Sequence, residues 1–118
     1  MDKIYYSDIK ETLYHEKIKN GLEVFLMPKD NFNKTYGLFT TDFGSIDRSF
    51  IPLGKENMIT VPDGVAHFLE HKMFDLKNGD ASEEFAKLGA SSNAYTSNVR
   101  TSYLFSTTQN ENECTELL

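Results

Sequence analysis

The sequence predicts an α+β fold, a mainly antiparallel sheet with helices packed on one face. Segments with strand character come in antiparallel runs near both ends, and segments with helical character are grouped between them. The composition, with 39% hydrophobic and 25% charged residues, is that of an ordinary globular protein. A length of 118 residues fits one domain.

The N-terminal part is expected to form a hairpin and a third strand. Two runs, 12–19 and 22–27, flank Asn20-Gly21, and both turn residues tolerate positive φ. Pro28 ends the second run. We expect His15, in the first run, to be exposed or paired across the strands rather than to bind a ligand. Residues 34–43 predict a third strand, and residues 45–62 a loop.

Two helices are expected in the middle of the chain. Asp63 is a natural N-cap for the first, with Gly64 at its first position, and Lys77-Asn78-Gly79 is expected to stop it. Its apolar residues spread beyond one narrow stripe, which predicts a well-buried helix. The capping-box-like run that begins at Asp80 starts the second helix, which ends at Leu88-Gly89. Its expected core contacts are Phe85 and Leu88.

The C-terminal part predicts a second hairpin and the start of a helix. Residues 92–97 and 101–107 read as strands joined by a turn at 98–100. Residues 113–118 look like the opening of a further helix, which stops at Leu117-Leu118 without a cap. We therefore expect residues 1–118 to be the N-terminal part of a longer domain.

The residues with the clearest chemistry are His67, Glu70 and His71, in the spacing H-x-x-E-H. On a helix the two histidines stand one turn apart on one face, and Glu70 shares that face. Phe68 and Leu69 would then point away, toward a core. Two imidazoles at this spacing can bind one zinc ion, and a carboxylate beside the metal-bound water can act as general base. The alternative is a solvated polar face with no ligand.

Charge and composition exclude other classes of function. The net charge of −6 argues against nucleic acid as a partner, since there is no basic stripe to neutralise phosphates. No apolar run is long enough to span a membrane, and the first residues do not resemble a signal peptide. Cys114 is the only cysteine, so an intrachain disulfide is impossible, and a half-buried helical position is expected for it. A cytoplasmic protein is the default expectation.

Several segments together resemble one family, the pitrilysin, insulysin and mitochondrial-processing-peptidase family of inverted-motif zinc peptidases. The opening hairpin with Asn20-Gly21, the glycine at position 44, the helix of residues 64–74, and the loop and strand of residues 88–96 each look like a part of its first domain. Lys72 and the run Gly79-Asp80-Ala81 resemble the small bacterial peptidases of this family.

The resemblance implies roles for individual residues. His67 and His71 would be zinc ligands, with one Zn²⁺ per complete site, and Glu70 would be the general base. Asn93, Ala94 and Thr96 match the strand that flanks the cleft and pairs with extended substrate. The third zinc ligand of the family is a glutamate that would lie beyond Leu118, and Glu111, Glu113 and Glu116 come too early to be assigned.

The function that follows is zinc-dependent endopeptidase action on peptides or small unfolded proteins through a zinc-activated water. The fragment alone is expected to be inactive, and the family pattern implies a second peptidase-like domain or subunit as a partner. The alternative is a non-catalytic module that binds peptide or serves as a scaffold in a peptidase complex. The intact His67, Glu70 and His71 argue against that alternative, because a scaffold needs none of them.

Overall fold

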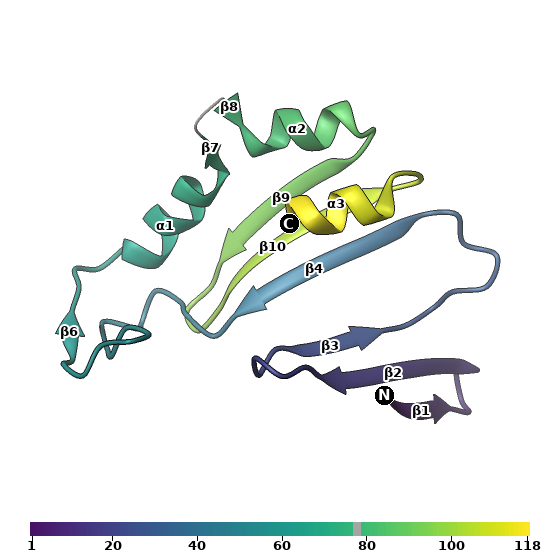
Figure 1. Cartoon of the computed structure of the whole chain (residues 1–118), viewed down its shortest axis with the longest axis horizontal. Helices are drawn as coiled ribbons and strands as arrows, with labels where there is room; N and C mark the ends of the chain where they lie inside the picture. Colours follow the sequence, from purple (N-terminus) through teal and green to yellow (C-terminus); the bar gives the residue numbers. More distant parts are fainter. Residues whose placement is uncertain (77–78) are drawn as a thin grey trace. The chain divides into compact units, whose positions relative to one another are not determined.

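The computed structural model of the chain describes residues 1–76 and 79–118. These residues form two compact units, residues 1–33 and residues 34–118, each of which is described by itself (Figure 1). The described residues include no helix with the length and apolar character needed to cross a membrane.

The first unit is a three-stranded antiparallel sheet in the order β1-β2-β3. Its strands are β1 (Asp2–Tyr6), β2 (Glu11–Lys17) and β3 (Glu23–Leu26). The predicted hairpin of β2 and β3 is confirmed. Strand β1 was not predicted, because all five of its residues are exposed and no burial pattern marks the segment.

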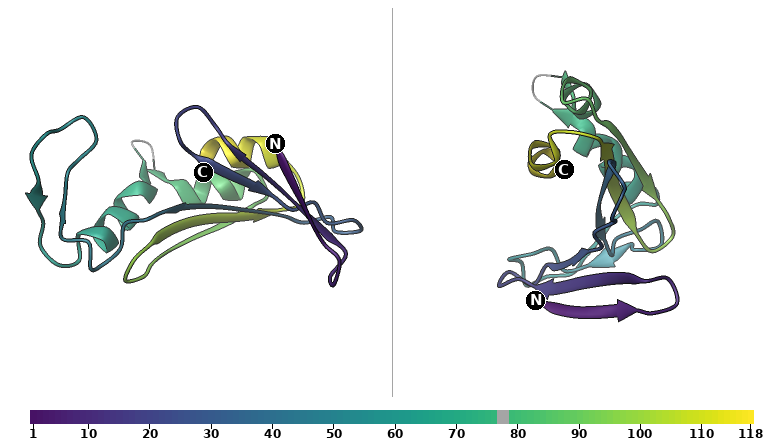
Figure 2. Two further views of the ribbon diagram at one scale, coloured as in Figure 1. Left: turned by 90° about the horizontal axis from the view of Figure 1, so that it is seen from below. Right: turned by 90° about the vertical axis from the view of Figure 1, so that its right-hand side faces the viewer.

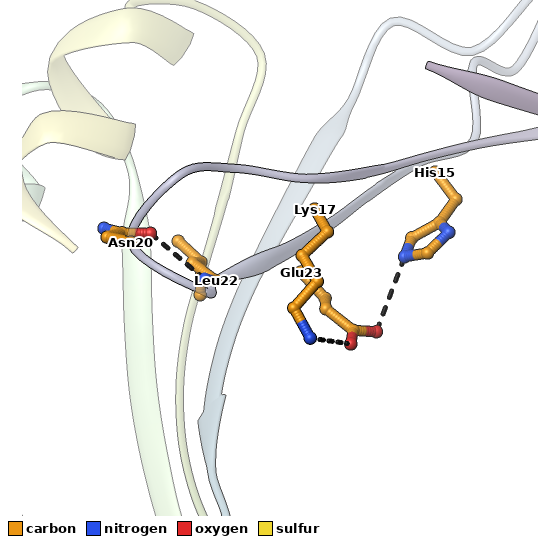
Figure 3. A network of polar contacts seen from close by, with 5 residues as sticks. All are labelled: His15, Lys17, Asn20, Leu22 and Glu23. Carbon is orange, nitrogen blue, oxygen red and sulfur yellow. Dashed lines mark hydrogen bonds and ion pairs between the residues drawn. The ribbon is translucent and has the colours of Figure 1, made fainter.

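The turn between β2 and β3 is wider than a two-residue Asn-Gly turn. The amides of Ile18 and Gly21 donate to the carbonyls of Leu22 and Ile18, both at 2.9 Å, so the loop has three residues. Gly21 adopts a φ of 93°, which only glycine adopts at little cost. The side chain of Asn20 accepts a hydrogen bond from the amide of Leu22 at 3.0 Å (Figure 3). The turn is therefore closed by the Asn20 side chain and the conformation of Gly21 together.

His15 is paired across the strands, as predicted. Its ring stacks on that of Phe25, its direct partner on β3, with ring centroids 4.5 Å apart. Its Nε2 lies 3.4 Å from Glu23 Oε2, and Lys17 Nζ approaches the other oxygen of that carboxylate at 3.5 Å (Figure 3). The residue thus has a local structural role in the hairpin.

The second unit is built on a sheet in the order β4-β10-β9, antiparallel throughout. Strands β4 (Thr35–Thr41), β9 (Ser91–Thr96) and β10 (Thr101–Thr107) confirm the three predicted strands. Gly44 lies against the turn between β9 and β10, where a side chain would overlap the backbone of Asn98. This close contact explains the glycine after β4.

Short strand pairs interrupt the segments between the main elements. The predicted loop of residues 45–62 contains β5 (Ser49–Phe50) and β6 (Ile59–Thr60), which pair with each other. Strands β7 (Asp75–Leu76) and β8 (Gly79–Asp80) form a second such pair. The predicted helix stop at Lys77-Asn78 lies outside the described residues, and the first helix ends at Phe74.

Three helices contact one face of the main sheet: α1 (Val65–Phe74), α2 (Ala81–Lys87) and α3 (Glu111–Leu117) (Figure 2). Phe74 of α1 stacks beside Tyr103 at 6.2 Å between centroids, and Phe85 of α2 beside Phe105 at 5.9 Å. Tyr103 and Phe105 are two residues apart on β10 and so share a face. The predicted α+β fold with helices on one face is confirmed.

The core lies where α2 and α3 meet β10. Phe85, Phe105 and Cys114 are fully buried there, and Leu88 packs against them. The predicted contacts of Phe85 and Leu88 are therefore correct. Cys114 is more buried than expected, with no exposed surface, because α3 presents it directly to the Phe85 and Phe105 rings.

The prediction that α1 is well buried was wrong. Phe68 and Leu69, expected to face a core, are 61% and 43% exposed. The helix contacts β9 and β10, and its buried or half-buried residues are Val65, Ala66, Glu70 and Phe74, the last three of them at four-residue spacing. The face with Glu70 and Phe74 is therefore the packing face, and the apolar side chains of Phe68, Leu69 and Met73 are exposed.

The predicted N-cap of α1 was also wrong. The N-cap is Gly64, with a left-handed φ of 87° and no side-chain hydrogen bond. Asp63 instead pairs with Arg48, with Nε and Oδ1 3.1 Å apart. The cap of α2 is as predicted: the Asp80 side chain accepts a hydrogen bond from the amide of Ser82 at 2.7 Å. Local capping preference was therefore correct for α2 and wrong for α1.

Candidate metal centre

The helical spacing of His67 and His71 brings their imidazoles together, as the sequence predicts. The two Nε2 atoms are 3.1 Å apart, and the ring centroids are 4.9 Å apart with the planes tilted by 32°. Both side chains are exposed on α1, so a ligand can reach them from solvent. His71 also lies in the last turn of the helix, where the helix dipole favours positive charge.

This separation fits two nitrogen ligands on one zinc ion. With Zn–N bonds of about 2.0–2.1 Å and tetrahedral angles, two ligand nitrogens lie about 3.3 Å apart. The observed 3.1 Å is close to that value, and the two rings direct their Nε2 atoms toward each other. Each imidazole would act in its neutral form with Nε2 deprotonated. The donor set, two imidazoles with a carboxylate nearby, also suits zinc.

Glu70 completes the cluster on the side of the sheet. Ligand atoms of His67, Glu70 and His71 all lie within 4.8 Å of one another. Unlike the histidines, Glu70 is half-buried, and its Oε2 accepts a hydrogen bond from the hydroxyl of Thr96 at 2.6 Å. The carboxylate is therefore anchored to β9 as well as to α1.

Tyr103 lies close enough to Glu70 for the charge of the carboxylate to affect the pKa of the phenol. Burial raises the pKa of the Tyr103 phenol, and the negative charge of Glu70 raises it further. The phenol thus remains neutral at physiological pH and keeps its proton. The uncharged Tyr103 side chain lies beside the ring of Phe74.

A shallow hollow of about 230 Å³ opens beside the cluster. Glu70, His71 and Phe74 line it from α1, and Asn93 and Ala94 line it from β9. The structure thus brings Asn93 and Ala94, two predicted substrate-strand residues, into one concavity with two members of the predicted zinc site. Thr96, the third, reaches the site through its hydroxyl at Glu70.

Strand β9 forms one edge of the main sheet. In the described part of the chain it pairs with β10 and has no strand on its other side. An unpaired edge can accept an extended peptide as an additional strand through backbone hydrogen bonds. The hollow lies along this strand, so a peptide added there would pass beside Glu70 and His71.

A third protein ligand is not found among residues 1–76 and 79–118. The metal-type cluster in these residues consists of His67, Glu70 and His71 alone. The carboxylate of Asp75 is engaged by Lys72 at 2.6 Å, and this hydrogen bond and the charge of Lys72 lower the pKa of Asp75. The glutamates of α3 lie outside the cluster.

The sequence did not predict two features of the site: the position of Tyr103 near Glu70, and the hydrogen bond from Thr96 to Glu70. Thr96 was predicted only as part of a substrate strand. The hairpin of residues 91–107 could have indicated both, because its register pairs Tyr103 with Ala94 and Thr101 with Thr96. Those pairs indicate which side chains share the face that α1 covers, but the sequence alone does not tell which face that is.

Comparisons with known proteins place the chain in a peptidase family. Residues 55–116 match the model of the family described as insulinase, peptidase family M16. The chain is 60% identical over 107 residues to a Bacillus subtilis (strain 168) protein named uncharacterized zinc protease YmfH. It also resembles the crystal structure of a protein described as an M16-like peptidase from Alicyclobacillus acidocaldarius, with 41% identity, a TM-score of 0.82 and 92% of this chain covered. The chain spans about a quarter of the length of each of these two proteins.

Proposed function

Because the chain belongs to the insulinase family of peptidases, family M16, we propose that it forms the first part of a zinc-dependent endopeptidase. The observation that carries the proposal is the pair of Nε2 atoms 3.1 Å apart on α1, with the Glu70 carboxylate beside them. The name of the Bacillus subtilis relative, a zinc protease, supports the choice of metal. The substrates would be peptides or small unfolded proteins.

His67 and His71 would hold the zinc ion through their Nε2 atoms. When bound, zinc lowers the pKa of a water molecule and polarises the peptide carbonyl. Glu70 is the residue that can take the proton from the attacking water and return it to the leaving amine. Its carboxylate is within reach of the metal position, since its ligand atom lies within 4.8 Å of both imidazole nitrogens.

The edge of β9 would hold the substrate. An extended peptide would add to the strand through backbone hydrogen bonds near Asn93 and Ala94, which line the hollow next to Glu70. Such pairing depends little on the side chains of the peptide and is compatible with substrates of varied sequence.

Residues 1–118 would not hydrolyse peptides alone. A catalytic zinc site takes three protein ligands and keeps one position open, and the described residues provide two histidines with Glu70 kept as the base. The third ligand is expected beyond Leu118, together with a second peptidase-like domain or subunit. We propose a cytoplasmic location for the complete protein.

The test is a Glu70→Gln variant of the complete protein, assayed with fluorogenic peptides and for bound zinc. The amide keeps the size of the side chain but cannot take a proton, so we expect zinc content to stay the same and kcat to fall by roughly 10²- to 10⁴-fold. Glu83→Gln, on α2 and outside the cluster, is the matched control and should retain activity. Cleavage should also stop on addition of a chelator and return with zinc.

Two results would refute the proposal. Full turnover by the Glu70→Gln variant would exclude Glu70 as the base. Tight peptide binding by the wild-type complete protein without any zinc-dependent cleavage would favour the non-catalytic peptide-binding module instead.

A further inference from the structure

We propose that Thr96 is a positioning residue for Glu70: its hydroxyl holds Oε2 of the carboxylate and thereby directs Oε1 toward the attacking water. The inference rests on the proposed function, since it concerns the same base. It assigns the side chain of Thr96 a role separate from the backbone of its strand. No described residue donates a hydrogen bond to Oε1, so that oxygen is the one left for the water.

The hydrogen bond has the geometry of a strong one. Thr96 Oγ1 and Glu70 Oε2 are 2.6 Å apart, within the range of charge-assisted O–H···O⁻ bonds. Both side chains are half-buried between α1 and β9, where a hydrogen bond competes less with water than it does on an open surface. The two residues are 26 positions apart, so the bond depends on the packing of the helix on the sheet.

The direction of this hydrogen bond is determined by the carboxylate. An ionised carboxylate only accepts, and a threonine hydroxyl has a single proton to donate. The hydroxyl of Thr101, the cross-strand partner of Thr96, is the other nearby polar group and lies farther away, at 3.5 Å, than the carboxylate at 2.6 Å; it donates to the carbonyl of Phe43 at 2.8 Å. The proton of Thr96 is therefore the one that lies between Oγ1 and Oε2.

The anchor itself is rigid. Thr96 is β-branched, so few χ1 rotamers are open to it. It is paired in register with Thr101, which is only 2% exposed and tied to Phe43 across the end of the sheet. A glutamate on an exposed helix face would sample several rotamers and would lose that freedom on each catalytic cycle. The hydrogen bond from Thr96 restricts the Glu70 rotamers when the protein folds. The catalytic step then no longer has to order the base, which raises kcat.

The competing explanation is that the Thr96–Glu70 hydrogen bond only stabilises the packing of α1 on β9. The two explanations predict different effects of replacing Thr96. If Thr96 only stabilises packing, its loss should lower thermal stability and zinc affinity together with activity. If it positions the base, its loss should lower kcat while KM and zinc affinity stay near wild type. Among the described residues, Thr96 makes no hydrogen bond to either histidine, and the backbone of β9, which would bind substrate, keeps its hydrogen-bonding groups when only a side chain is replaced.

The experiment compares Thr96→Val and Thr96→Ser in the complete protein. Valine keeps the shape of the side chain but has no hydroxyl, and serine restores the hydroxyl. We expect kcat to fall roughly ten- to a hundredfold in Thr96→Val, the effect of losing one hydrogen bond to a charged group, with KM and zinc affinity changed less than about threefold. Thr96→Ser should recover most of kcat. Zinc affinity is measured separately by chelator competition, which needs no turnover.

Thr40→Val is the matched control. It is the same substitution in the same sheet and removes a hydrogen bond of similar length, 2.9 Å from Thr40 Oγ1 to Ser102 Oγ, on the face away from α1. This variant should lose some stability but keep kcat. It separates the loss of a sheet hydroxyl from the loss of the contact with Glu70.

Crystal structures of the complete wild-type protein and the two Thr96 variants give a readout that is independent of activity. The Glu70 carboxylate should leave its position in Thr96→Val and keep it in Thr96→Ser. Three results would overturn the inference: kcat within threefold of wild type in Thr96→Val, zinc affinity falling in parallel with kcat, or an unmoved Glu70. Wild-type protein without zinc-dependent cleavage would overturn the proposed function instead, and the crystal structures would then decide alone whether Thr96 fixes Glu70.

Discussion

Replacement of His71 by alanine should cut zinc affinity by roughly two to three orders of magnitude. The structure places His71 Nε2 3.1 Å from His67 Nε2. With Zn–N bonds of about 2.05 Å, that separation corresponds to an angle at the metal of about 98°, near the tetrahedral value. The helix therefore holds both imidazoles near the geometry that zinc requires. Loss of one imidazole removes a metal–nitrogen bond, and little strain in the helix is relieved by that loss.

The magnitude follows from typical zinc sites. Structural sites with four ligands bind zinc with about 10–16 kcal/mol of apparent free energy, or about 2.5–4 kcal/mol for each ligand. A loss of this size is about 10²- to 10³-fold in the dissociation constant. The estimate applies to the complete protein, in which a third protein ligand is expected.

The assay is competition with a fluorescent zinc chelator at constant pH, because ligand protonation makes zinc affinity depend on pH. His15→Ala is the control: it removes an imidazole that stacks on Phe25 in the first hairpin and is not part of the cluster. It should bind zinc as the wild type does. An affinity of His71→Ala within about fivefold of wild type, or an equal loss in His15→Ala, would refute the assignment of the metal centre.

Two further predictions concern the core of the second unit. Gly37→Ala should destabilise the protein by about 1–3 kcal/mol, since the new methyl group would overlap the ring of Phe105, which is buried and cannot move away; an unchanged midpoint in chemical denaturation would contradict this packing. Cys114 should react with a thiol reagent at pH 8 at least about a hundredfold more slowly in the native than in the unfolded protein, because burial raises its pKa and blocks access. With the folded pKa above the unfolded one, the stability linked to this thiol is present at neutral pH and is lost as pH rises through the folded pKa. Labelling of the native protein at the rate of a free thiol would show that the packing of α3 against Phe85 and Phe105 does not bury Cys114.

Local signals in the sequence predicted much of the fold. The run around Asn20-Gly21 indicated a hairpin, because turn chemistry depends on residues next to each other. The Asp80 cap of α2 was correct for the same reason. Strands β4, β9 and β10 were found from their β-branched and aromatic residues. Strand β1 was missed, since a fully exposed strand has no alternating pattern to detect.

The orientation of α1 could not be predicted in the same way. Phe68 and Leu69 favoured a buried face by their composition, yet the face with Ala66 and Glu70 is the one that packs on the sheet. A helix with apolar residues on more than one side does not specify its packing face by periodicity alone. The neighbours available in space decide, and a single sequence does not show them.

The candidate metal centre has some features that depend on local sequence and others that depend on tertiary structure. The sequence by itself determined that His67, Glu70 and His71 share one side of a helix, because the pitch of an α-helix brings residues at these spacings together. Only the tertiary structure decided that Glu70 is held by Thr96 and that Asn93 and Ala94 line the same hollow. Those contacts join a helix to a strand more than 20 residues away, and they depend on strand register and on how the helix lies on the sheet, which no local rule specifies.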